Sequence, residues 1–491
     1  MSSDLLSFRA CGDEGHSGPP FHIRSPSPSP HSAPMTLVVR IRSGTCSPLA
    51  RTLSWTCRHP VRVRSYATDN PTHVHVSVKD HPTDNWTNVT PTILSKVDRN
   101  LHLVPNHPLS ILRQKIEAHF SSLKPVNTLS PIVSVRQNFD DLGFPLDHPG
   151  RSLTDSYYLN KDTMLRTHTS AHEVELFRKG LQRFLLTADV YRRDEIDRSH
   201  YPVFHQVEGC NILSSRDELP RLEKENEAMR QHLASSNIII VDPTKEDTPS
   251  NPKQAEYTLD EARIMSEHLK NSLNSLVLSL FGGLRKGGEE EPLQVRWIEA
   301  TFPWTAPSYE VEVLYDGKWL EILGCGVVRQ QALDRSGVPE KLGWAFGLGL
   351  ERIAMVLFSI PDIRLFWTQD ERFLSQFEND RITTFKPYSK YPECYKDFSF
   401  WIPHQTEGKR EDGVKAWHEN DFCEIVRDVA GDWVEGIQLI DEFVHPKTGR
   451  RSVCYRLNYR SMDRSLSNEE VNELQSKVVE VVVREMGIEV R

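Results

Sequence analysis

Three features are missing from this chain of 491 residues, and each narrows what the protein can be. No uninterrupted apolar run comes near the roughly 18 residues needed to cross a bilayer, so we expect no membrane-spanning segment. The eight cysteines are scattered and form no Cys-x-x-Cys pair, which argues against a zinc ribbon or a disulfide framework and favours reduced, buried thiols. From Gly15 to Thr68 there is no aspartate or glutamate.

This acid-free amino end is rich in serine, proline and arginine. Its arginines are Arg24, Arg40, Arg42, Arg51, Arg58, Arg62 and Arg64. Such a composition is typical of an organelle transit peptide, which needs positive charge to cross an inside-negative membrane, although the stretch Ser25–Pro34 also suits an ordinary disordered tail. Arg64-Ser65-Tyr66-Ala67 resembles the arginine-directed cleavage site of mitochondrial presequences. We therefore predict a mitochondrial transit peptide over residues 1–66, with Met35 as an alternative start.

The charge that remains after cleavage is strongly negative. Loss of residues 1–66 would remove eight arginines and three acids, which takes the net charge from −9 to about −14. A protein this acidic cannot hold a nucleic acid through its overall charge, so any such partner must be held by local basic surface.

The apolar pattern predicts an α+β fold for a larger domain over residues 67–370, with a polar insertion at about 213–258 and a linker over 371–384. Residues 124–165 look irregular, and Ser236–Tyr257 has the polarity of a surface segment. We expect helices over Asn100–Ser121, Ala171–Leu186, Arg216–Leu233, Leu259–Phe281 and from Glu351, and strands at both ends of Asp189–Asn211 and over Gln294–Phe302, Ser308–Tyr315, Trp319–Val328 and Trp344–Leu350. Because strands and helices do not alternate regularly, an antiparallel sheet flanked by helices is favoured over a doubly wound fold.

A Pro-rich stretch, Phe385–Pro403, opens a separate carboxy-terminal domain over 385–491. Ser467 and Glu470 stand at capping-box spacing and mark a helix start. The expected elements are strands over Ser399–Ile402, Val434–Phe443, Arg451–Arg460 and Ile488–Arg491 and helices over Asp421–Ala430 and Asn468–Met486. Their order, βαββαβ, is the ferredoxin-like arrangement.

The most informative stretch is WAFGLGLERIAMV, residues 344–356. In a strand, Ala345, Gly347 and Gly349 share one face while Trp344 and Phe346 pack into the core from the other. A flat ligand could lie against this bare face, although glycines in a strand also mark bulges or close backbone packing.

A second motif lies roughly 150 residues earlier, where Arg192-Arg193-Asp194 is followed by a loop and His200-x-x-x-Phe204. Guanidinium groups offer fork-shaped donors to phosphate oxygens, and an aromatic ring such as Phe204 can stack on adenine. Taken alone, Arg192 could be a surface ion pair and Phe204 a core residue. Together and in this order, the two motifs resemble motifs 2 and 3 of class II aminoacyl-tRNA synthetases.

Further blocks narrow the resemblance to phenylalanyl-tRNA synthetases of the monomeric mitochondrial type, from about residue 86 to 491. These blocks are Arg166–His172, Tyr201–Gly209, Phe302–Trp304, Gly324–Val328 and Ile360–Trp367. The carboxy-terminal domain resembles the anticodon-binding domain of this type. The resemblance implies ATP-dependent ligation of L-phenylalanine to mitochondrial tRNA(Phe) through a phenylalanyl-adenylate, in the mitochondrial matrix, with Mg²⁺ but no zinc, by a monomer that binds no membrane.

The resemblance also implies site residues. Arg192 and Arg352 would be catalytic, and the ATP-binding residues would be Arg192, Asp194, Ser199, His200, Tyr201, Phe204 and Arg352. Phenylalanine would be bound by His168, Ser170, Ala171, His172, Glu173, Gln206, Glu208, Phe302, Trp304, Ala345 and Phe346. Glu321 would hold magnesium, unless it only pairs with Lys318 or Arg329.

Strand periodicity supports part of this set. Phe204, Gln206 and Glu208 fall on one face at period two, so an aromatic ring, an amide and a carboxylate would point into the same cavity. Phe302 and Trp304 would meet a substrate ring edge to face. The usual family pattern is Phe-Pro-Phe, so Trp304 is a departure that leaves the pocket depth open, and in this family Ala345 limits the room beyond the para position.

The carboxy-terminal domain is acidic overall, with 16 basic and 20 acidic residues over 385–491, yet Lys447–Arg464 is basic. We predict tRNA contacts from Lys447, Arg450, Arg451, Arg456 and Arg460, with a merely solvated charged face as the alternative.

Two other classes of function stay open at this point. A catalytically inactive, synthetase-like RNA-binding or regulatory protein would be favoured by loss of either motif arginine, and both are present. A ligase for another amino acid is opposed by the aromatic pocket.

Overall fold

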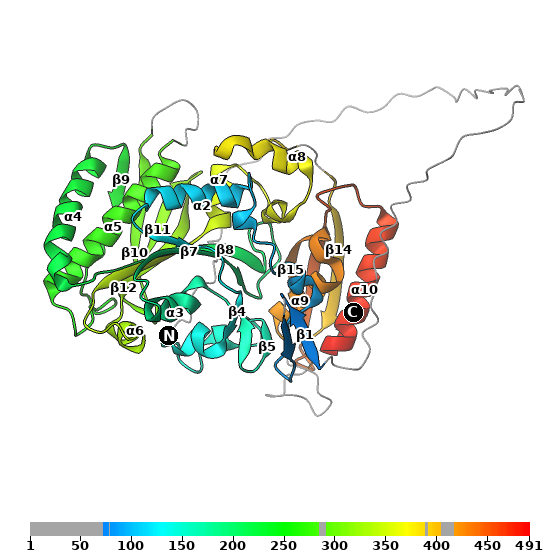
Figure 1. Ribbon diagram of the computed structural model, residues 1–491. Coiled ribbons are helices and arrows are strands. Elements are labelled where there is room, and N and C mark those ends of the chain that lie inside the picture. Colours follow the sequence, from blue (N-terminus) through cyan, green and yellow to red (C-terminus); the bar gives the residue numbers. More distant parts are fainter. Residues whose placement is uncertain (1–71, 78, 284–290, 388–390, 404–416) are drawn as a thin grey trace, which may run out of the picture. The chain divides into compact units, whose positions relative to one another are not determined.

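The computed structural model describes residues 72–77, 79–283, 291–387, 391–403 and 417–491, and the predicted transit peptide lies outside them. An eight-stranded sheet forms the centre of the larger domain, in the order β3-β7-β8-β13-β12-β11-β10-β9 (Figure 1). Its strands are β3 (Lys124–Val126), β7 (Arg183–Tyr191), β8 (Val203–Ile212), β9 (Ile238–Val241), β10 (Leu293–Ala300), β11 (Thr305–Tyr315), β12 (Lys318–Val328) and β13 (Gly343–Gly349). The pairings are antiparallel except for β3 with β7 and β9 with β10, as expected of a mainly antiparallel sheet.

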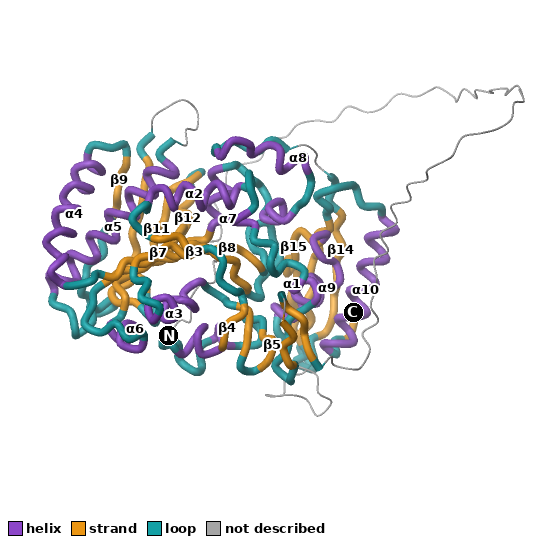
Figure 2. The backbone as a smooth tube through the Cα atoms, viewed as in Figure 1, coloured by secondary structure: helices purple, strands orange, loops and turns teal. Residues whose placement is uncertain are grey.

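Helices cover both faces of this sheet (Figure 2). On one face, α2 (Pro108–His119), α5 (Leu259–Phe281) and α7 (Leu350–Leu357) share a core with Trp344 and Phe346. On the other face, α3 (Glu173–Arg178) and α6 (Gln330–Arg335) pack with Cys210 and Ala345. The predicted alternation of side chains along residues 344–350 is therefore confirmed. A further long helix, α4 (Leu219–Ala234), packs on α5.

The predicted helix over Ala171–Leu186 is wrong in its second half. The chain forms a short turn, η4 (Thr169–His172), then α3, which ends at Arg178. Gly180 follows with φ +77°, a left-handed conformation that stops the helix, and strand β7 begins at Arg183. The apolar residues beyond Gly180 pair with β3 and β8 instead of continuing the helix.

Several short elements were not predicted from the sequence. The polar insertion contains β9, which pairs with β10, and the segment expected to be irregular contains β4 (Ile132–Ser134), β5 (Tyr158–Asn160) and β6 (Thr163–Leu165), which form a small sheet. A hairpin, β1 (His73–Val76) and β2 (Lys79–Pro82), precedes them. The remaining short helices are α1 (Pro91–Leu94), η1 (Leu101–Leu103), η2 (Arg136–Asp140), η3 (Pro149–Arg151), η5 (Arg216–Glu218), η6 (Ile363–Trp367) and η8 (Gly431–Trp433).

The segment predicted to be a linker, 371–384, is structured. It forms α8 (Glu371–Leu374) and η7 (Ser375–Asp380), and Phe373, Phe377 and the following Phe385 are buried in the large core. Aromatic side chains drive this packing, because each buries a large apolar area. Throughout the described part of the chain, no helix is both long enough and apolar enough to cross a membrane.

The carboxy-terminal domain has the predicted ferredoxin-like order. Its elements are β14 (Cys394–Trp401), α9 (Glu419–Ala430), β15 (Val434–Val444), β16 (Arg451–Tyr459), α10 (Asn468–Met486) and β17 (Glu489–Val490), and its sheet order is β15-β16-β14-β17. The predicted capping box at Ser467 and Glu470 starts α10. On β16, Val453, Tyr455 and Leu457 are buried in the core that α9 and α10 complete.

Polar contacts join this domain to residues of the larger one. Arg193 pairs with Asp421 at 2.8 Å, and the Tyr157 hydroxyl donates to Glu424 at 2.7 Å. Arg193, which belongs to the second sequence motif, therefore makes a structural contact between the two domains.

Candidate active site

The floor of the site is the glycine-bearing face of β13. A Cβ atom added at Gly347 or Gly349 would meet no heavy atom of the described residues within 4 Å beyond its chain neighbours, so both positions open onto free space. At Gly324, which pairs with Gly347 in the sheet, an added Cβ would lie 2.7 Å from the Phe302 ring. At Gly209 it would lie 2.2 Å from Phe346. Gly347 and Gly349 therefore leave open space and do not serve close packing, whereas Gly209 and Gly324 on the neighbouring strands permit close packing of aromatic rings.

Arg192 stands over one end of this floor. Its Nε donates to the Thr167 carbonyl oxygen at 2.8 Å, and its guanidinium carbon lies 5.2 Å from the centroid of the Phe204 ring. The two contacts fix the plane of the guanidinium beside a half-buried aromatic ring. Burial lowers the pKa of Arg192, and Asp194 opposes this effect. The arrangement offers oriented cationic donors next to a surface on which a planar base can stack.

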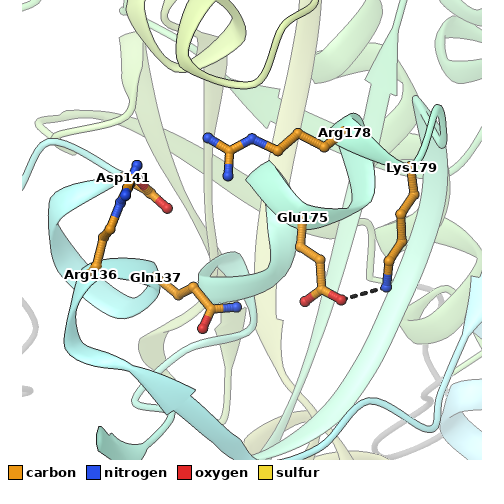
Figure 3. Close-up of a pocket in the computed structure, with 6 residues that line it drawn as sticks. All are labelled: Arg136, Gln137, Asp141, Glu175, Arg178 and Lys179. Carbon is orange, nitrogen blue, oxygen red and sulfur yellow. Dashed lines mark hydrogen bonds and ion pairs between the residues drawn. The ribbon is translucent and has the colours of Figure 1, made fainter. Parts of the chain in front are cut away.

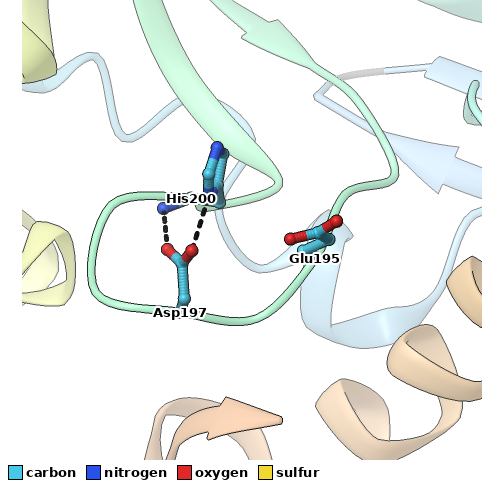
Figure 4. Close-up of side chains that lie close together, drawn as sticks. All are labelled: Glu195, Asp197 and His200. Atoms are coloured by element: carbon cyan, nitrogen blue, oxygen red, sulfur yellow. Dashed lines mark hydrogen bonds and ion pairs between the residues drawn. The ribbon is translucent and has the colours of Figure 1, made fainter. Parts of the chain in front are cut away.

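The loop between β7 and β8 is held by Asp197 (Figure 4). Its carboxylate accepts from the backbone nitrogens of Ser199 at 2.6 Å and His200 at 2.7 Å, and lies 2.8 Å from His200 Nδ1. The hydrogen bond to Asp197 raises the pKa of His200 against the effect of burial, which favours the imidazolium that a phosphate would require. Glu195, Asp197 and His200 offer ligand atoms within 4.8 Å of one another, and they form the one such group of three in the described ranges. The carboxylate of Asp197 already accepts hydrogen bonds from within the loop.

Arg352, at the start of α7, lies near the same loop. Burial lowers its pKa, while Glu321, Asp197 and Asp194 raise it. The charge of Asp194 acts on the pKa of both Arg192 and Arg352, so the arginines of the two sequence motifs share this carboxylate as an electrostatic partner.

Glu321 on β12 belongs to a group of three carboxylates. Burial and the neighbouring Glu310 and Glu312 raise the pKa of Glu321 to about 7, while Arg352 lowers it. Glu312 lies directly opposite Glu321 in the sheet and also pairs with Arg296. Carboxylate oxygens are the donors that Mg²⁺ prefers, but those of Glu310, Glu312 and Glu321 do not all lie within 4.8 Å of one another, so these described residues do not form a ready-made site of three ligands.

Glu310 and Glu312 were missed from the sequence. The signal that could have found them is the alternation Glu310-Val311-Glu312 within the strand predicted over Ser308–Tyr315, which puts two carboxylates on one face of the sheet.

The polar end of the predicted phenylalanine site centres on Glu208, which is 2% exposed. Its Oε2 accepts from the Thr169 hydroxyl at 2.8 Å and the Ser170 hydroxyl at 2.6 Å. Gln206 Oε1, one strand step away, accepts from the Thr169 backbone nitrogen at 3.3 Å. Burial, and next the charge of Arg192, lower the pKa of His168 to about 3, so its ring is neutral. A carboxylate, an amide and a neutral imidazole suit an ammonium group.

Aromatic rings line the other end of this pocket. Phe302 and Trp304 lie 5.8 Å apart between centroids, and Trp304 stacks on His168, also at 5.8 Å. Phe144 completes the group, 5.4 Å from Trp304 and 5.6 Å from His168. Phe144 was not predicted, because it follows η2 in a Pro- and Gly-rich segment without periodicity. The set offers edges and faces to one apolar ring.

Two predicted residues turn their side chains away from the site. Tyr201 is buried against Trp367 and donates to Asp432 at 2.6 Å. Phe346 is 2% exposed and packs on Phe120 at 5.3 Å, on the helix-covered face. Any contribution of these two positions to the site is made by the backbone.

Ala171 and His172 are also turned away. Ala171 packs in a small cluster around β4 and β6, and His172 Nε2 lies 3.0 Å from Arg166 Nη1. Ser199 is exposed on the loop, and Ala345 is buried beside Cys210 at the edge of the floor.

The predicted tRNA-binding arginines are each paired with an acid. The pairs are Arg450 with Glu489, Arg451 with Glu442, Arg456 with Asp397 and Arg460 with Glu435. Lys447 is exposed in the turn between β15 and β16. Arg450 and Arg491 also lie 5.0 and 5.5 Å from the Trp401 ring. The positive charge of these arginines is therefore balanced by neighbouring acids, and RNA would have to compete with those acids for the arginines.

A separate cavity of about 340 Å³ lies outside this site, between η2 and α3 (Figure 3). It is lined by Arg136, Gln137, Asp141, Glu175, Arg178 and Lys179. Two of its three cations are paired with acids, Arg136 with Asp141 and Lys179 with Glu175, and Arg178 donates to the Arg335 carbonyl oxygen.

Comparison with known proteins agrees with this geometry. Residues 94–233 and 246–377 match the family described as tRNA synthetases class II core domain (F), and residues 389–491 match the ferredoxin-fold anticodon binding domain. The mitochondrial phenylalanine–tRNA ligase of Saccharomyces cerevisiae is 48% identical over 437 residues, covering 82% of this chain and 92% of that protein. The mitochondrial phenylalanine–tRNA ligase of Mus musculus is 44% identical over 421 residues, covering 83% and 86%. The chain therefore belongs to the phenylalanine–tRNA ligases, within the class II tRNA synthetases.

Proposed function

We propose that this protein joins L-phenylalanine to mitochondrial tRNA(Phe) in two steps, with ATP as the activating substrate and a phenylalanyl-adenylate as the intermediate. The observation that carries the proposal is the shared face of β8 and β13. At one end, Arg192 lies over the Phe204 ring. At the other end is the buried carboxylate of Glu208, with the aromatic group of Phe302, Trp304 and Phe144. Gly347 and Gly349 leave open space on the paired strand β13. The names of the relatives agree with this chemistry.

The spacing along β8 sets the two substrates side by side. Phe204, Gln206 and Glu208 are separated by strand steps of about 6.5 Å. With adenine on Phe204 and the substrate ammonium at Glu208, the phenylalanine carboxylate lies toward Arg192, where the α-phosphate is held. A carboxylate oxygen then bonds to the α-phosphorus as the bond from that phosphorus to the bridging oxygen of pyrophosphate breaks.

The protein contributes alignment and charge stabilisation rather than a proton-transferring base. Arg192 would stabilise the charge on the α-phosphate, and Arg352 and His200 the charge on the outer phosphates. Glu321 with Glu310 would hold Mg²⁺, which neutralises charge on the departing pyrophosphate. A hydroxyl of the terminal ribose of the tRNA then attacks the acyl carbon of the adenylate and loses its proton as the bond from that carbon to the phosphate oxygen breaks and AMP leaves; family resemblance implies the 2′-hydroxyl.

Selection of phenylalanine would rest on the aromatic end of the pocket. Phe302, Trp304 and Phe144 surround one ring, and Ala345 bounds it beyond the para position. Rejection of tyrosine by size and by an unpaired hydroxyl is modest compared with a site built to bond a hydroxyl.

The decisive measurement is exchange of pyrophosphate into ATP by purified protein lacking residues 1–66, with each amino acid in turn. Phenylalanine should support the fastest exchange, and the same protein should then charge tRNA(Phe). If the protein binds tRNA without any exchange, it is a synthetase-like binding protein. If another amino acid supports faster exchange, the substrate assignment is wrong.

The cellular part of the proposal is import into the mitochondrial matrix followed by removal of residues 1–66, and a monomeric enzyme there. Support comes from the arginine-rich, acid-free amino end and from the mitochondrial names of the relatives. Import into isolated mitochondria with sequencing of the new amino terminus tests the first point. Light scattering of the enzyme tests the second, and a dimer mass would contradict it.

A further inference from the structure

Two glutamates lie against one another in the wall of the proposed phenylalanine pocket. Glu173 is the first residue of α3 and Glu208 lies on β8, and their side chains are 0% and 2% exposed. Thr169 and Ser170, which come shortly before Glu173 in the chain, both donate to Glu208, and a hydrogen bond between the two carboxyl groups acts on the pKa of each. Two ionised carboxylates at this separation, removed from water, repel each other strongly, so the pair must hold a proton.

The hydrogen bonds show which carboxyl carries that proton. Glu208 Oε2 accepts from two hydroxyl groups, of Thr169 and Ser170, and such donors stabilise the ionised form. Both oxygens of Glu173, and Oε1 of Glu208, accept no hydrogen bond from any other group in the described chain. Burial raises the pKa of both groups; the charge of Glu208 raises that of Glu173 further, well above its usual value, whereas hydrogen bonds from Glu173, Ser170 and Thr169 lower that of Glu208. Glu173 is therefore the protonated partner, and its O–H has Glu208 Oε1 to donate to.

This arrangement sets the charge of the pocket. The pair carries one negative charge, which matches the single positive charge of a substrate ammonium. Two negative charges would leave one uncompensated in a buried site, and none would leave the ammonium without a counterion. A side chain that donates to Oε1 also fixes the rotation of the Glu208 carboxylate, whose other oxygen is already fixed by the two hydroxyls.

We propose that Glu173 is a positioning residue for the substrate ammonium group: it shares one proton with Glu208 and thereby holds the Glu208 carboxylate singly charged and correctly oriented. The inference rests on the proposed function, in which Glu208 binds the ammonium of phenylalanine. It changes the role predicted for Glu173 from the sequence: instead of binding phenylalanine directly, Glu173 acts through Glu208 and need not touch the substrate.

Two substitutions separate this role from simple packing. Glu173→Gln keeps the volume and offers an amide N–H to Glu208 Oε1, so the KM for phenylalanine should stay within about 3-fold of wild type. Glu173→Ala removes the donor, and the KM for phenylalanine should rise about 10- to 100-fold, the scale of losing one hydrogen bond to a charged group. The KM for ATP should change less than about 2-fold in both. Glu227→Gln, on the exposed side of α4, is the matched control and should change neither value.

An infrared measurement tests the proton itself. At about pH 8, above the pKa of about 7 of Glu321, the substrate-free enzyme should show the carbonyl band of a protonated, hydrogen-bonded carboxylic acid, and this band should be missing from Glu173→Gln. This readout does not depend on activity or on the alanine variant being stable.

The inference is overturned if folded Glu173→Ala keeps the wild-type KM for phenylalanine, if Glu173→Gln is impaired as much as Glu173→Ala, or if the carboxylic acid band persists in Glu173→Gln. Any of these results with an active wild-type enzyme leaves the proposed function intact. Absence of phenylalanine-dependent exchange in the wild type would instead overturn the proposed function.

Discussion

Replacing Gly347 by alanine should abolish most of the activity while leaving the fold intact. Gly347 has no left-handed backbone requirement, and its added Cβ would meet nothing within 4 Å among the described residues. The substitution should therefore change the free energy of unfolding by less than about 0.5 kcal/mol. In the complex, however, the methyl group would stand in the volume that the nucleotide occupies. Forcing one extra carbon into a packed space costs about 1–3 kcal/mol, which corresponds to a loss of about 5- to 150-fold in kcat/KM for ATP.

The matched control is Gly209→Ala on the neighbouring strand. There the added Cβ would lie 2.2 Å from the Phe346 ring, so the fold itself should be destabilised, and the midpoint of thermal unfolding should fall. Calorimetry and pyrophosphate exchange on both variants separate the two cases. If Gly347→Ala is as stable as wild type and keeps the wild-type kcat/KM for ATP, the open face of β13 is not the substrate floor.

Four further substitutions probe other parts of the site. Arg192→Lys should lower kcat for exchange about 100-fold with little change in stability, because an ammonium group cannot both donate to Thr167 and offer two parallel donors to a phosphate. Single-turnover exchange measures this rate, and an unchanged rate would show that Arg192 does not bind the phosphate. Asp197→Asn removes the charged hydrogen-bond partner that raises the pKa of His200, so His200 should lose its proton at lower pH. As the pH rises, kcat/KM for ATP should therefore begin to fall at a lower pH than in wild type. An unshifted pH profile would show that His200 does not act as a cation. Glu321→Gln should raise the Mg²⁺ concentration needed for half-maximal exchange about 10-fold or more, and a titration that matches wild type would place the metal elsewhere. Lys447→Ala should weaken tRNA binding and leave amino acid activation unchanged, and filter binding beside pyrophosphate exchange tests both parts.

The long amphipathic helices were predictable because their signals are local. The predicted bounds of α5 and α10 agree with the structure, and both helices begin with a capping box, at Thr258 and Glu261 and at Ser467 and Glu470. A capping box fixes the first turn from residues three apart, and the 3.6-residue period then fixes the buried face. The alternation along β8 and β13 was equally local, which is why the residues that share each face of these strands could be named from the sequence.

The end of α3 could not be predicted in this way. Leu181, Phe184 and Leu185 suit a helix face and a buried strand equally well, and the choice was made by pairing with β3 and β8, which are distant in sequence. The left-handed conformation of Gly180 decides the boundary, but a glycine near a helix end is only a weak signal.

The parts of the site that were missed come from segments without a period. Phe144 reaches the aromatic box from an irregular stretch, so only the tertiary fold reveals it. Tyr201 illustrates the opposite error: it lies within a matching block, but its side chain stacks on Trp367 and donates to Asp432. A motif places a segment near a site, whereas burial and hydrogen bonding decide which side chains face it.

The proposed separation of charge along the site would let an acidic protein orient a zwitterion and bind a polyanion. The chain carries a net charge of −9, so under the proposed function ATP would be attracted by Arg192, Arg352 and His200. The negative charge of Glu208, which is buried, would lie at the other end and be shared with Glu173. An amino acid placed between these ends would experience opposite charges along its own dipole, so its ammonium would turn to Glu208 and its carboxylate to Arg192. The field that binds each substrate would then also align the reacting atoms, and reversing either end would cost alignment as well as affinity.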